Sequence, residues 1–257
     1  MKIVTWNVNS LRLREDLVLN WIEGEDPDVV CLQETKVPDQ EFPEDSFGDL
    51  EYDVAFYGQP AYNGVAIASH EEQEDVTPGF PSDDDDSERR FLAATVEGIR
   101  LVDLYVPNGQ TYASDKYAYK LRWLDELTGL LEKELAANEA VVVCGDFNIA
   151  PRDVDAHDPH LLDEKSLFVS TEERAAFSRL LDLGLTDAFA HLHGDADKPY
   201  TWWDYRGGSW ERNRGLRIDH FLVSDAVLAR AKSVTIHRAM RGEEQPSDHV
   251  PVVLELD

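Results

Sequence analysis

The sequence is poor in cysteine and holds no long apolar run. Cys31 and Cys144 are the only cysteines among 257 residues, and each lies in a short apolar segment. Without metal-type spacing or secretory signals, they are expected to be unpaired thiols in the core. No segment approaches the roughly 20 apolar residues that cross a membrane, and there is no basic leader with a small-residue end. These absences favour a soluble protein of the cytoplasm with no membrane partner.

Basic residues are also scarce. The chain has 24 Lys and Arg against 52 Asp and Glu, a formal net charge of −28 at pH 7. This sign argues against a nucleic-acid partner, because DNA is itself a polyanion. Acid spread over many loops is also typical of halophilic proteins, since salt screens self-repulsion within about 3 Å at 1 M. We therefore interpret the charge as an adaptation to a salty solvent.

The pattern of apolar residues predicts an α/β fold. Strands are expected where β-branched, apolar runs occur, at residues 2–8, 29–32, 54–57, 65–68, 91–96, 99–106, 140–144, 218–223 and 250–256. Apolar residues that recur at intervals of three and four predict helices near residues 11–23, 115–137 and 171–183. Ser10, Ser114 and Ser170 are the expected helix caps, the last in a capping box with Glu173.

No Gly/Ser linker or abrupt change in composition divides the chain, so residues 1–257 are expected to form a single domain. We predict a four-layered α/β sandwich, in which two packed mixed β-sheets are flanked by helices. The acidic stretch 71–88 is expected to be a solvated loop.

Polar residues stand where several predicted strands begin or end. Strand ends are where a rigid scaffold meets loops, so such side chains can converge on one site, although each alone could be a cap or turn residue. The residues concerned are Asn7, Glu34, Asp146, Asn148, Asp219, Asp248 and His249.

Phosphodiester hydrolysis explains why these residue types occur together. Mg²⁺ takes oxygen ligands from one or two carboxylates, which suits Glu34, and it can polarise a phosphoryl oxygen. A second carboxylate such as Asp146 can activate water, while the neutral asparagines can bind phosphate without repelling it. His249, held by Asp219, would supply positive charge to the transition state. The sequence contains no Gly-x-Ser-x-Gly motif and no P-loop.

Six blocks of the sequence carry a family resemblance. In chain order they resemble the signatures of the exonuclease III family of abasic-site endonucleases, within the endonuclease/exonuclease/phosphatase superfamily. TWWDYR and GLRID resemble the DNA-repair branch, whereas the others are shared with relatives that hydrolyse phospholipids, inositol phosphates or RNA tails. The blocks are MKIVTWNVNSLR (1–12), LQETK (32–36), GDFNIAP (145–151), TWWDYR (201–206), GLRID (215–219) and SDHVP (247–251).

The resemblance implies a DNA-repair hydrolase. It would cut double-stranded DNA 5′ to abasic sites and trim 3′ ends, using Mg²⁺ with Mn²⁺ as a substitute, and we expect it to be a monomer. Two alternatives stay open: the same chemistry on an inositol phosphate, sphingolipid or RNA tail, and a non-catalytic nucleic-acid-binding relative.

By the same resemblance, the metal is expected on Glu34, with Asn7, Asp146, Asn148 and Asp248 beside it. Asp146 would activate the water, and the asparagines would position the phosphate.

Two further roles follow from the resemblance. Asp219 would pair with His249. Tyr105 matches a tyrosine that contacts the scissile phosphate; the alternative is a core residue at a strand end.

DNA contacts are expected from aromatic and basic residues. Trp202 and Trp203 resemble the aromatic wall of a pocket for an extruded abasic sugar, although one should be core because successive strand residues face opposite sides. His220 stands where the family usually has an apolar or aromatic residue, which leaves its packing open. The basic residues that could contact phosphates, or else form surface ion pairs, are Arg89, Arg90, Lys116, Lys120, Arg206, Arg212, Arg214 and Arg217.

Overall fold

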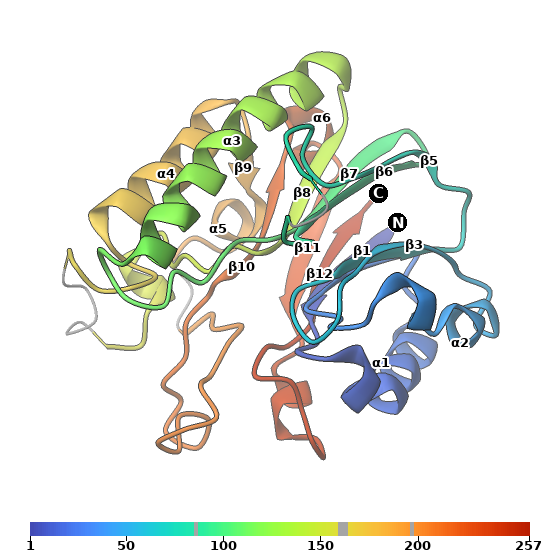
Figure 1. The fold of residues 1–257 in the computed structure, drawn as a ribbon, viewed down its shortest axis with the longest axis horizontal. Coiled ribbons are helices and arrows are strands. Elements are labelled where there is room, and N and C mark those ends of the chain that lie inside the picture. The colour runs from blue at the N-terminus through green and yellow to red at the C-terminus, as the bar shows by residue number, and fades with distance from the viewer. Residues whose placement is uncertain (85–86, 159–163, 196–197) are drawn as a thin grey trace.

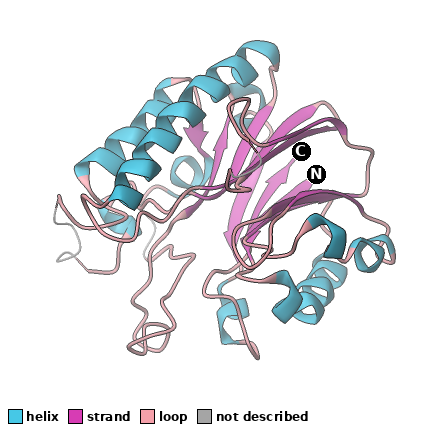
Figure 2. Cartoon of the chain, viewed as in Figure 1, coloured by secondary structure: helices cyan, strands magenta, loops and turns pink. Residues whose placement is uncertain are grey.

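The computed structural model describes residues 1–84, 87–158, 164–195 and 198–257. Two six-stranded sheets pack face to face, and helices cover both outer sides (Figures 1 and 2). The predicted four-layered α/β sandwich is confirmed. Across these described ranges, no helix has the length and apolar character needed to span a membrane.

The first sheet contains both the first and the last strand of the chain. Its only parallel pair is β1 with β2, and the other neighbours are antiparallel. An apolar layer that includes Trp6 and Trp21 joins its outer face to helices α1 (Leu11–Glu25) and α2 (Glu44–Gly48). The strand order is β11 (Ala231–Ile236), β12 (Val252–Leu256), β1 (Lys2–Asn7), β2 (Val29–Gln33), β4 (Val65–Ser69) and β3 (Asp53–Tyr57).

The second sheet repeats this plan, with β7 and β8 as its parallel pair. A second apolar layer, which includes Leu124 and Phe177, joins it to helices α3 (Asp115–Ala137) and α4 (Thr171–Asp182). Two short helices, α5 (Ala188–His193) and α6 (Asp225–Leu228), flank β10 and β11. The strand order is β5 (Glu74–Pro78), β6 (Phe91–Val96), β7 (Ile99–Tyr105), β8 (Val141–Asp146), β10 (Asp219–Val223) and β9 (Thr186–Asp187).

The main core fills the space between the two sheets. Residues from both sheets meet there, among them Ile3, Cys31, Leu101, Cys144 and Phe221, all at most 1% exposed. Both cysteines are buried thiols outside any disulfide. The prediction of unpaired core thiols is therefore confirmed.

Most of the predicted elements are present, with corrections at one helix cap and at short or edge elements. Ser114 and Ser170 cap their helices as expected, but the side chain of Ser10 accepts no capping hydrogen bond within the described chain. The acidic stretch 71–88 was expected to be a loop, yet β5 lies inside it, along the edge of the second sheet. The edge strands β9 and β11 and the short helices α2, α5 and α6 were not predicted, since such elements show little apolar periodicity.

The strand ends that carry polar residues lie together at one edge of the sandwich. The parallel pairs β1/β2 and β7/β8 finish there, and β10 begins opposite the end of β8, with Asp219 paired to Asp146. Gly145 permits the close approach of β8 to β7, because a Cβ at that position would lie 1.9 Å from the backbone oxygen of Leu104 on β7. The fold therefore brings the predicted site residues to one place.

Candidate active site

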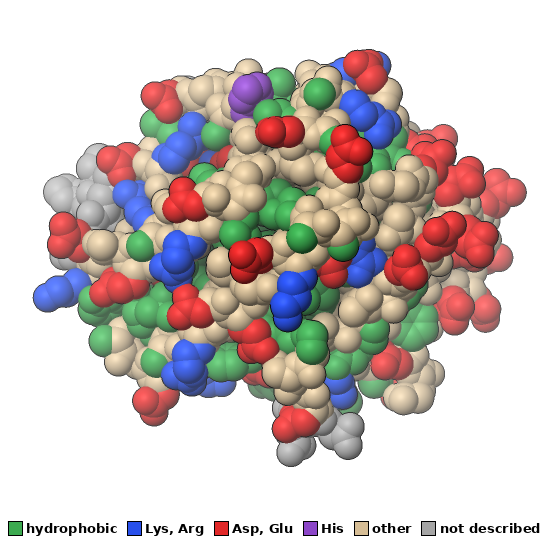
Figure 3. Space-filling model, turned by 90° about the horizontal axis from the view of Figure 1, so that it is seen from above, with side chains coloured by type: hydrophobic (Ala, Val, Ile, Leu, Met, Phe, Trp, Pro, Cys, Tyr) green, Lys and Arg blue, Asp and Glu red, His purple; other side chains and the backbone are tan. Residues whose placement is uncertain are grey.

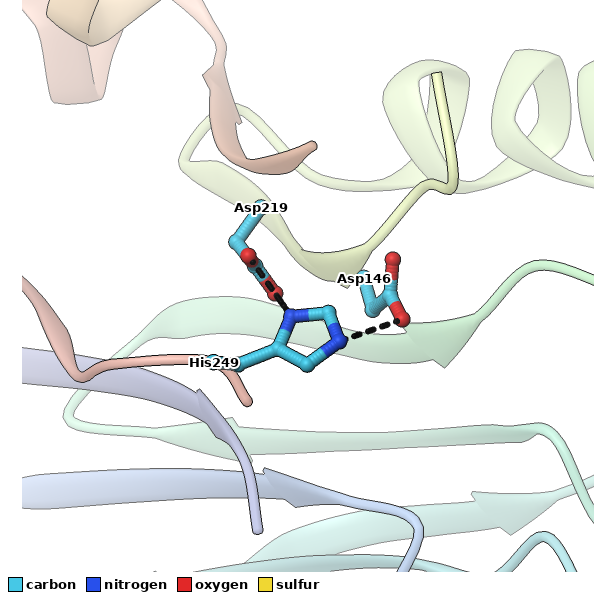
Figure 4. Close-up of side chains that lie close together, drawn as sticks. All are labelled: Asp146, Asp219 and His249. Atoms are coloured by element: carbon cyan, nitrogen blue, oxygen red, sulfur yellow. Dashed lines mark hydrogen bonds and ion pairs between the residues drawn. The ribbon is translucent and has the colours of Figure 1, made fainter. Parts of the chain in front are cut away.

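His249 lies between two aspartates at the centre of this edge (Figure 4). Its Nδ1 is 3.0 Å from Asp219 Oδ2, and its Nε2 is 3.6 Å from Asp146 Oδ2. All three residues are at most 4% exposed. Because Asp219 accepts the Nδ1 proton, the imidazole presents Nε2 toward Asp146 and the open side of the site.

Asn7 joins this group to Glu34. Its amide nitrogen donates to Glu34 Oε1 at 2.8 Å and to Asp146 Oδ2 at 2.9 Å. Asn148 holds the same aspartate from the other side, through its backbone N–H at 2.8 Å and its side-chain amide at 3.2 Å. In this arrangement both asparagines orient the carboxylates.

A second chain of contacts links Glu34 to Asp248. Lys36 Nζ lies 2.9 Å from Glu34 Oε2 and also donates to Asn9. Asn9 Nδ2 donates to Asp248 Oδ1 at 2.9 Å, and the indole N–H of Trp202 donates to Asp248 Oδ2 at 2.9 Å. Asp248 therefore lies beside the site, as the sequence predicted.

Two of the predicted site residues adopt left-handed backbone conformations. Glu34 and Asn148 both have φ of 51°. Residues with side chains occupy this region at a cost of roughly 1–3 kcal/mol each, and such strain clusters at functional sites. The surrounding contacts evidently hold both residues against this cost.

The electrostatics of the site follow from its burial and its crowded carboxylates. Burial raises the pKa of Asp146, and the negative charges of Asp219 and Glu34 raise it further, against the opposing effect of His249. Burial disfavours a charged His249, but Asp219 and Asp146 outweigh it and raise the imidazole pKa. At neutral pH the site therefore combines a positively charged histidine with a carboxylate able to accept a proton.

The donor set suits a hard divalent cation. Asn7 holds oxygens of Glu34 and Asp146 next to each other, and carboxylate oxygens are the ligands that such ions prefer. The ligand atoms of Asp146, Asp219 and His249 also lie within 4.8 Å of one another. Because Asp219 and His249 already bind each other, we favour the Glu34 side for a cation.

A groove of about 410 Å³ opens beside Glu34 and Tyr105. Burial, followed by the negative charge of Glu34, raises the pKa of the Tyr105 phenol, so the proton stays on the oxygen. The Arg90 guanidinium lies 4.4 Å from the centre of the Tyr105 ring and pairs with Glu88 at 2.7 Å. Both predicted residues therefore line this groove.

A second, more apolar pocket of about 420 Å³ is lined in part by Trp202. Its walls include Leu167, Phe168 and Leu216. Trp203 was predicted as a DNA contact, but it is fully buried against Tyr200 and neighbouring apolar residues. Trp202 and Trp203 face opposite sides of the chain, so of these two residues only Trp202 lines the apolar pocket.

Arg206 lies on an exposed loop. Residues 204–215 project from the lower edge of the molecule in Figure 1, and Arg206 is exposed within them. A DNA contact by Arg206 stays a prediction.

Arg217 was also predicted to contact DNA, and this prediction is wrong. The side chain is 1% exposed and binds Asp155 at 2.7 Å and Asp187 at 2.8 Å. His220 is buried beside it, with Nδ1 2.9 Å from an Arg217 nitrogen and Nε2 2.9 Å from the Ile149 carbonyl oxygen. Arg217 is therefore the centre of an internal polar network beneath the site.

Lys120 is likewise unavailable to phosphate. The residue is fully buried and forms an ion pair with Glu173.

Three residues of the site were missed from the sequence. Asn9 and Lys36 were not assigned a role, although they follow Asn7 and Glu34 by two positions. Asn108 donates to Asn148 Oδ1 at 3.1 Å. The spacing of two from Asn7 and Glu34 was the available signal for Asn9 and Lys36.

Comparison with known proteins agrees with this geometry. Residues 4–249 match the Endonuclease/Exonuclease/phosphatase family. The chain belongs to the endonuclease/exonuclease/phosphatase family. It is 36% identical to exodeoxyribonuclease III of Haemophilus influenzae, with 100% of each chain covered. It is 34% identical to a DNA repair nuclease of Danio rerio, covering 100% of this chain and 82% of that one.

Solved structures of this family share the fold. A 3′ phosphatase from Neisseria bound to a product DNA hairpin has a TM-score of 0.97 at 44% identity, with 100% of this chain and 99% of that one covered. An AP endonuclease from Archaeoglobus fulgidus has a TM-score of 0.93 at 39% identity, with the same coverage. The predicted resemblance and the assignment to the exodeoxyribonuclease III type of hydrolase are confirmed.

Proposed function

We propose that the chain is a Mg²⁺-dependent DNA-repair phosphodiesterase that cuts 5′ to abasic sites and also trims 3′ ends. The observation that carries the proposal is the contact between His249, Asp219 and Asp146, joined to Glu34 through Asn7. Relatives described as exodeoxyribonuclease III, as an AP endonuclease and as a 3′ phosphatase support both activities.

In the proposed mechanism, Asp146 accepts a proton from the attacking water, which suits its raised pKa. The charged His249, oriented by Asp219, stabilises negative charge on the phosphoryl oxygens. Mg²⁺ bound by Glu34, with Mn²⁺ as a substitute, would polarise the phosphate and neutralise charge there.

The two cavities beside the site would receive the DNA. The apolar pocket beside Trp202 has room for an extruded sugar, and the groove beside Tyr105 and Arg90 has donors for the backbone. The single-domain organisation, the monomeric state, the cytoplasmic location and the halophilic adaptation stay predictions.

Cleavage of two labelled substrates tests the proposal. One is a duplex with a tetrahydrofuran abasic analogue and the other a hairpin with a 3′-phosphate, each with Mg²⁺ or EDTA from low to molar KCl. We expect a single Mg²⁺-dependent cut 5′ to the analogue and release of phosphate from the hairpin. An undamaged duplex is the control. Absence of cleavage at every salt concentration would contradict the proposal and favour an inositol-phosphate, lipid or RNA substrate.

A further inference from the structure

A completely buried lysine lies behind the catalytic loop. Lys120 on α3 and its ion-pair partner Glu173 on α4 are both 0% exposed. The Lys120 ammonium also lies 2.7 Å from the backbone oxygen of Asn148 and 3.4 Å from that of Asn108. These two asparagines stand in the loops that follow β7 and β8. One buried cation therefore binds both loops.

The same two asparagines contact each other on the side of the site. Asn108 Nδ2 donates to Asn148 Oδ1 at 3.1 Å, and Asn148 donates twice to Asp146. The φ of Asn148 is 51°, a left-handed conformation that contacts from neighbouring groups help to hold. The ammonium at its carbonyl oxygen provides such support.

Stability alone is a weak explanation for this ion pair. Removing two charges from water is costly, and apolar residues of similar volume are often equally stabilising or better. Glu173 has a second task, since its Oε2 accepts from the backbone N–H and the hydroxyl of Ser170 to cap α4. Lys120 binds the other oxygen of the same carboxylate, and its remaining donors point to the backbone oxygens of Asn108 and Asn148.

We propose that Lys120 is a positioning residue for hydrolysis: its ammonium fixes the backbone of Asn148 and, through Asn148, the orientation of Asp146. The inference rests on the proposed function, because it assigns Asp146 the role of accepting a proton from water.

A double variant separates positioning from folding. Lys120→Met/Glu173→Gln removes both buried charges, while the new amide oxygen can still accept the capping hydrogen bonds from Ser170. We expect it to fold, with kcat lowered roughly 10- to 100-fold because Asp146 is misplaced, and with KM for the abasic duplex unchanged. Arg179→Met/Asp125→Asn is the matched control, because it removes an exposed ion pair between the same two helices, α3 and α4. It should retain kcat within about twofold.

A folded double variant with the kcat of the wild type would overturn the inference. Its crystal structure gives a test that needs no activity: Asn148 should leave its contacts with Asp146, and unchanged contacts would also overturn the inference. Failure of the proposed function has a different signature, since the wild type itself would then cleave neither DNA substrate.

The wild-type protein offers a second test that does not depend on a variant. With ¹⁵N-labelled lysine, nuclear magnetic resonance should show one ammonium group whose protons exchange slowly with water, assigned to Lys120. Exchange as fast as that of the exposed lysines would contradict its buried hydrogen bonds to the two loops.

Discussion

The indole Nε1 of Trp202 donates a hydrogen bond to Asp248 Oδ2 at 2.9 Å. The same indole ring forms one wall of the apolar pocket. Trp202 therefore connects the pocket to the carboxylates of the site. Residues that orient a metal-site carboxylate commonly affect metal affinity, even though they do not touch the ion.

Trp202→Phe should weaken the response to Mg²⁺ while leaving DNA binding largely intact. Phenylalanine keeps an apolar wall but loses the N–H donor to Asp248. We therefore expect the Mg²⁺ concentration that gives half-maximal cleavage to rise roughly tenfold. Isothermal titration with Mg²⁺ and the Mg²⁺ dependence of cleavage both measure this shift. Leu167→Ala is the control, since Leu167 is a partly buried residue of the same pocket wall; it leaves the indole N–H in place and should raise KM. An unchanged Mg²⁺ titration in Trp202→Phe would show that the hydrogen bond is dispensable.

Asp146→Asn should abolish turnover and spare DNA binding. The amide cannot accept a proton from water, and loss of a general base typically costs roughly 10²- to 10⁴-fold in rate. Single-turnover cleavage measures the rate, and fluorescence anisotropy measures DNA binding. Full activity in this variant would mean that another group activates the water.

The buried His220 should make the protein sensitive to mild acid. Burial, followed by the charge of Arg217, lowers the pKa of His220 from 6.5 to about 4. The unfolded chain therefore binds this proton more readily than the folded chain. Stability is fully present above pH 6.5 and is lost as pH falls toward 4, by roughly 3 kcal/mol in total.

His220→Gln tests this pH dependence, because a glutamine can still bind the Ile149 carbonyl oxygen and accept from Arg217. Thermal melts at pH 7, 5.5 and 4.5 should show a smaller loss of stability in His220→Gln than in the wild type. His191→Gln, at an exposed position, serves as the control. Equal losses in the wild type and His220→Gln would exclude His220 as the source.

Salt should stabilise the protein. Its net charge is −28, and acidic side chains crowd the face drawn in Figure 3, most densely toward one edge. Because screening shortens self-repulsion to about 3 Å at 1 M, the melting temperature should rise from low to molar KCl. Glu71→Gln/Glu72→Gln/Glu74→Gln, at exposed positions, should be more stable at low salt and respond less to KCl. A melting temperature independent of salt in the wild type would contradict the halophilic interpretation.

The sequence was informative where apolar periodicity governs structure. The central strands and the helices α1, α3 and α4 were predicted within a few residues, because each buries a continuous apolar face. The edge strands β5 and β11 were not, since they bury little and their pairing is decided by neighbours distant in the chain. The site residues could be predicted because most of them stand at strand ends, which meet at one edge of the sandwich, and because they lie in blocks that resemble a known family.

Charged residues were harder to assign, because a sequence does not show which charges meet inside the fold. Arg217 binds Asp155 and Asp187, which are 62 and 30 positions away in the chain. Because of these two ion pairs, Arg217 lies in the core and does not contact DNA as expected.

The left-handed conformations of Glu34 and Asn148 have an evolutionary consequence. At these two positions glycine would relieve backbone strain, so the folded state alone would favour replacing the residues that the proposed chemistry requires. A library selected only for heat resistance should therefore accumulate glycine at 34 and 148, whereas one selected for DNA cleavage should keep the original pair. Positions where the two selections diverge would then mark the active site without any assay of individual residues.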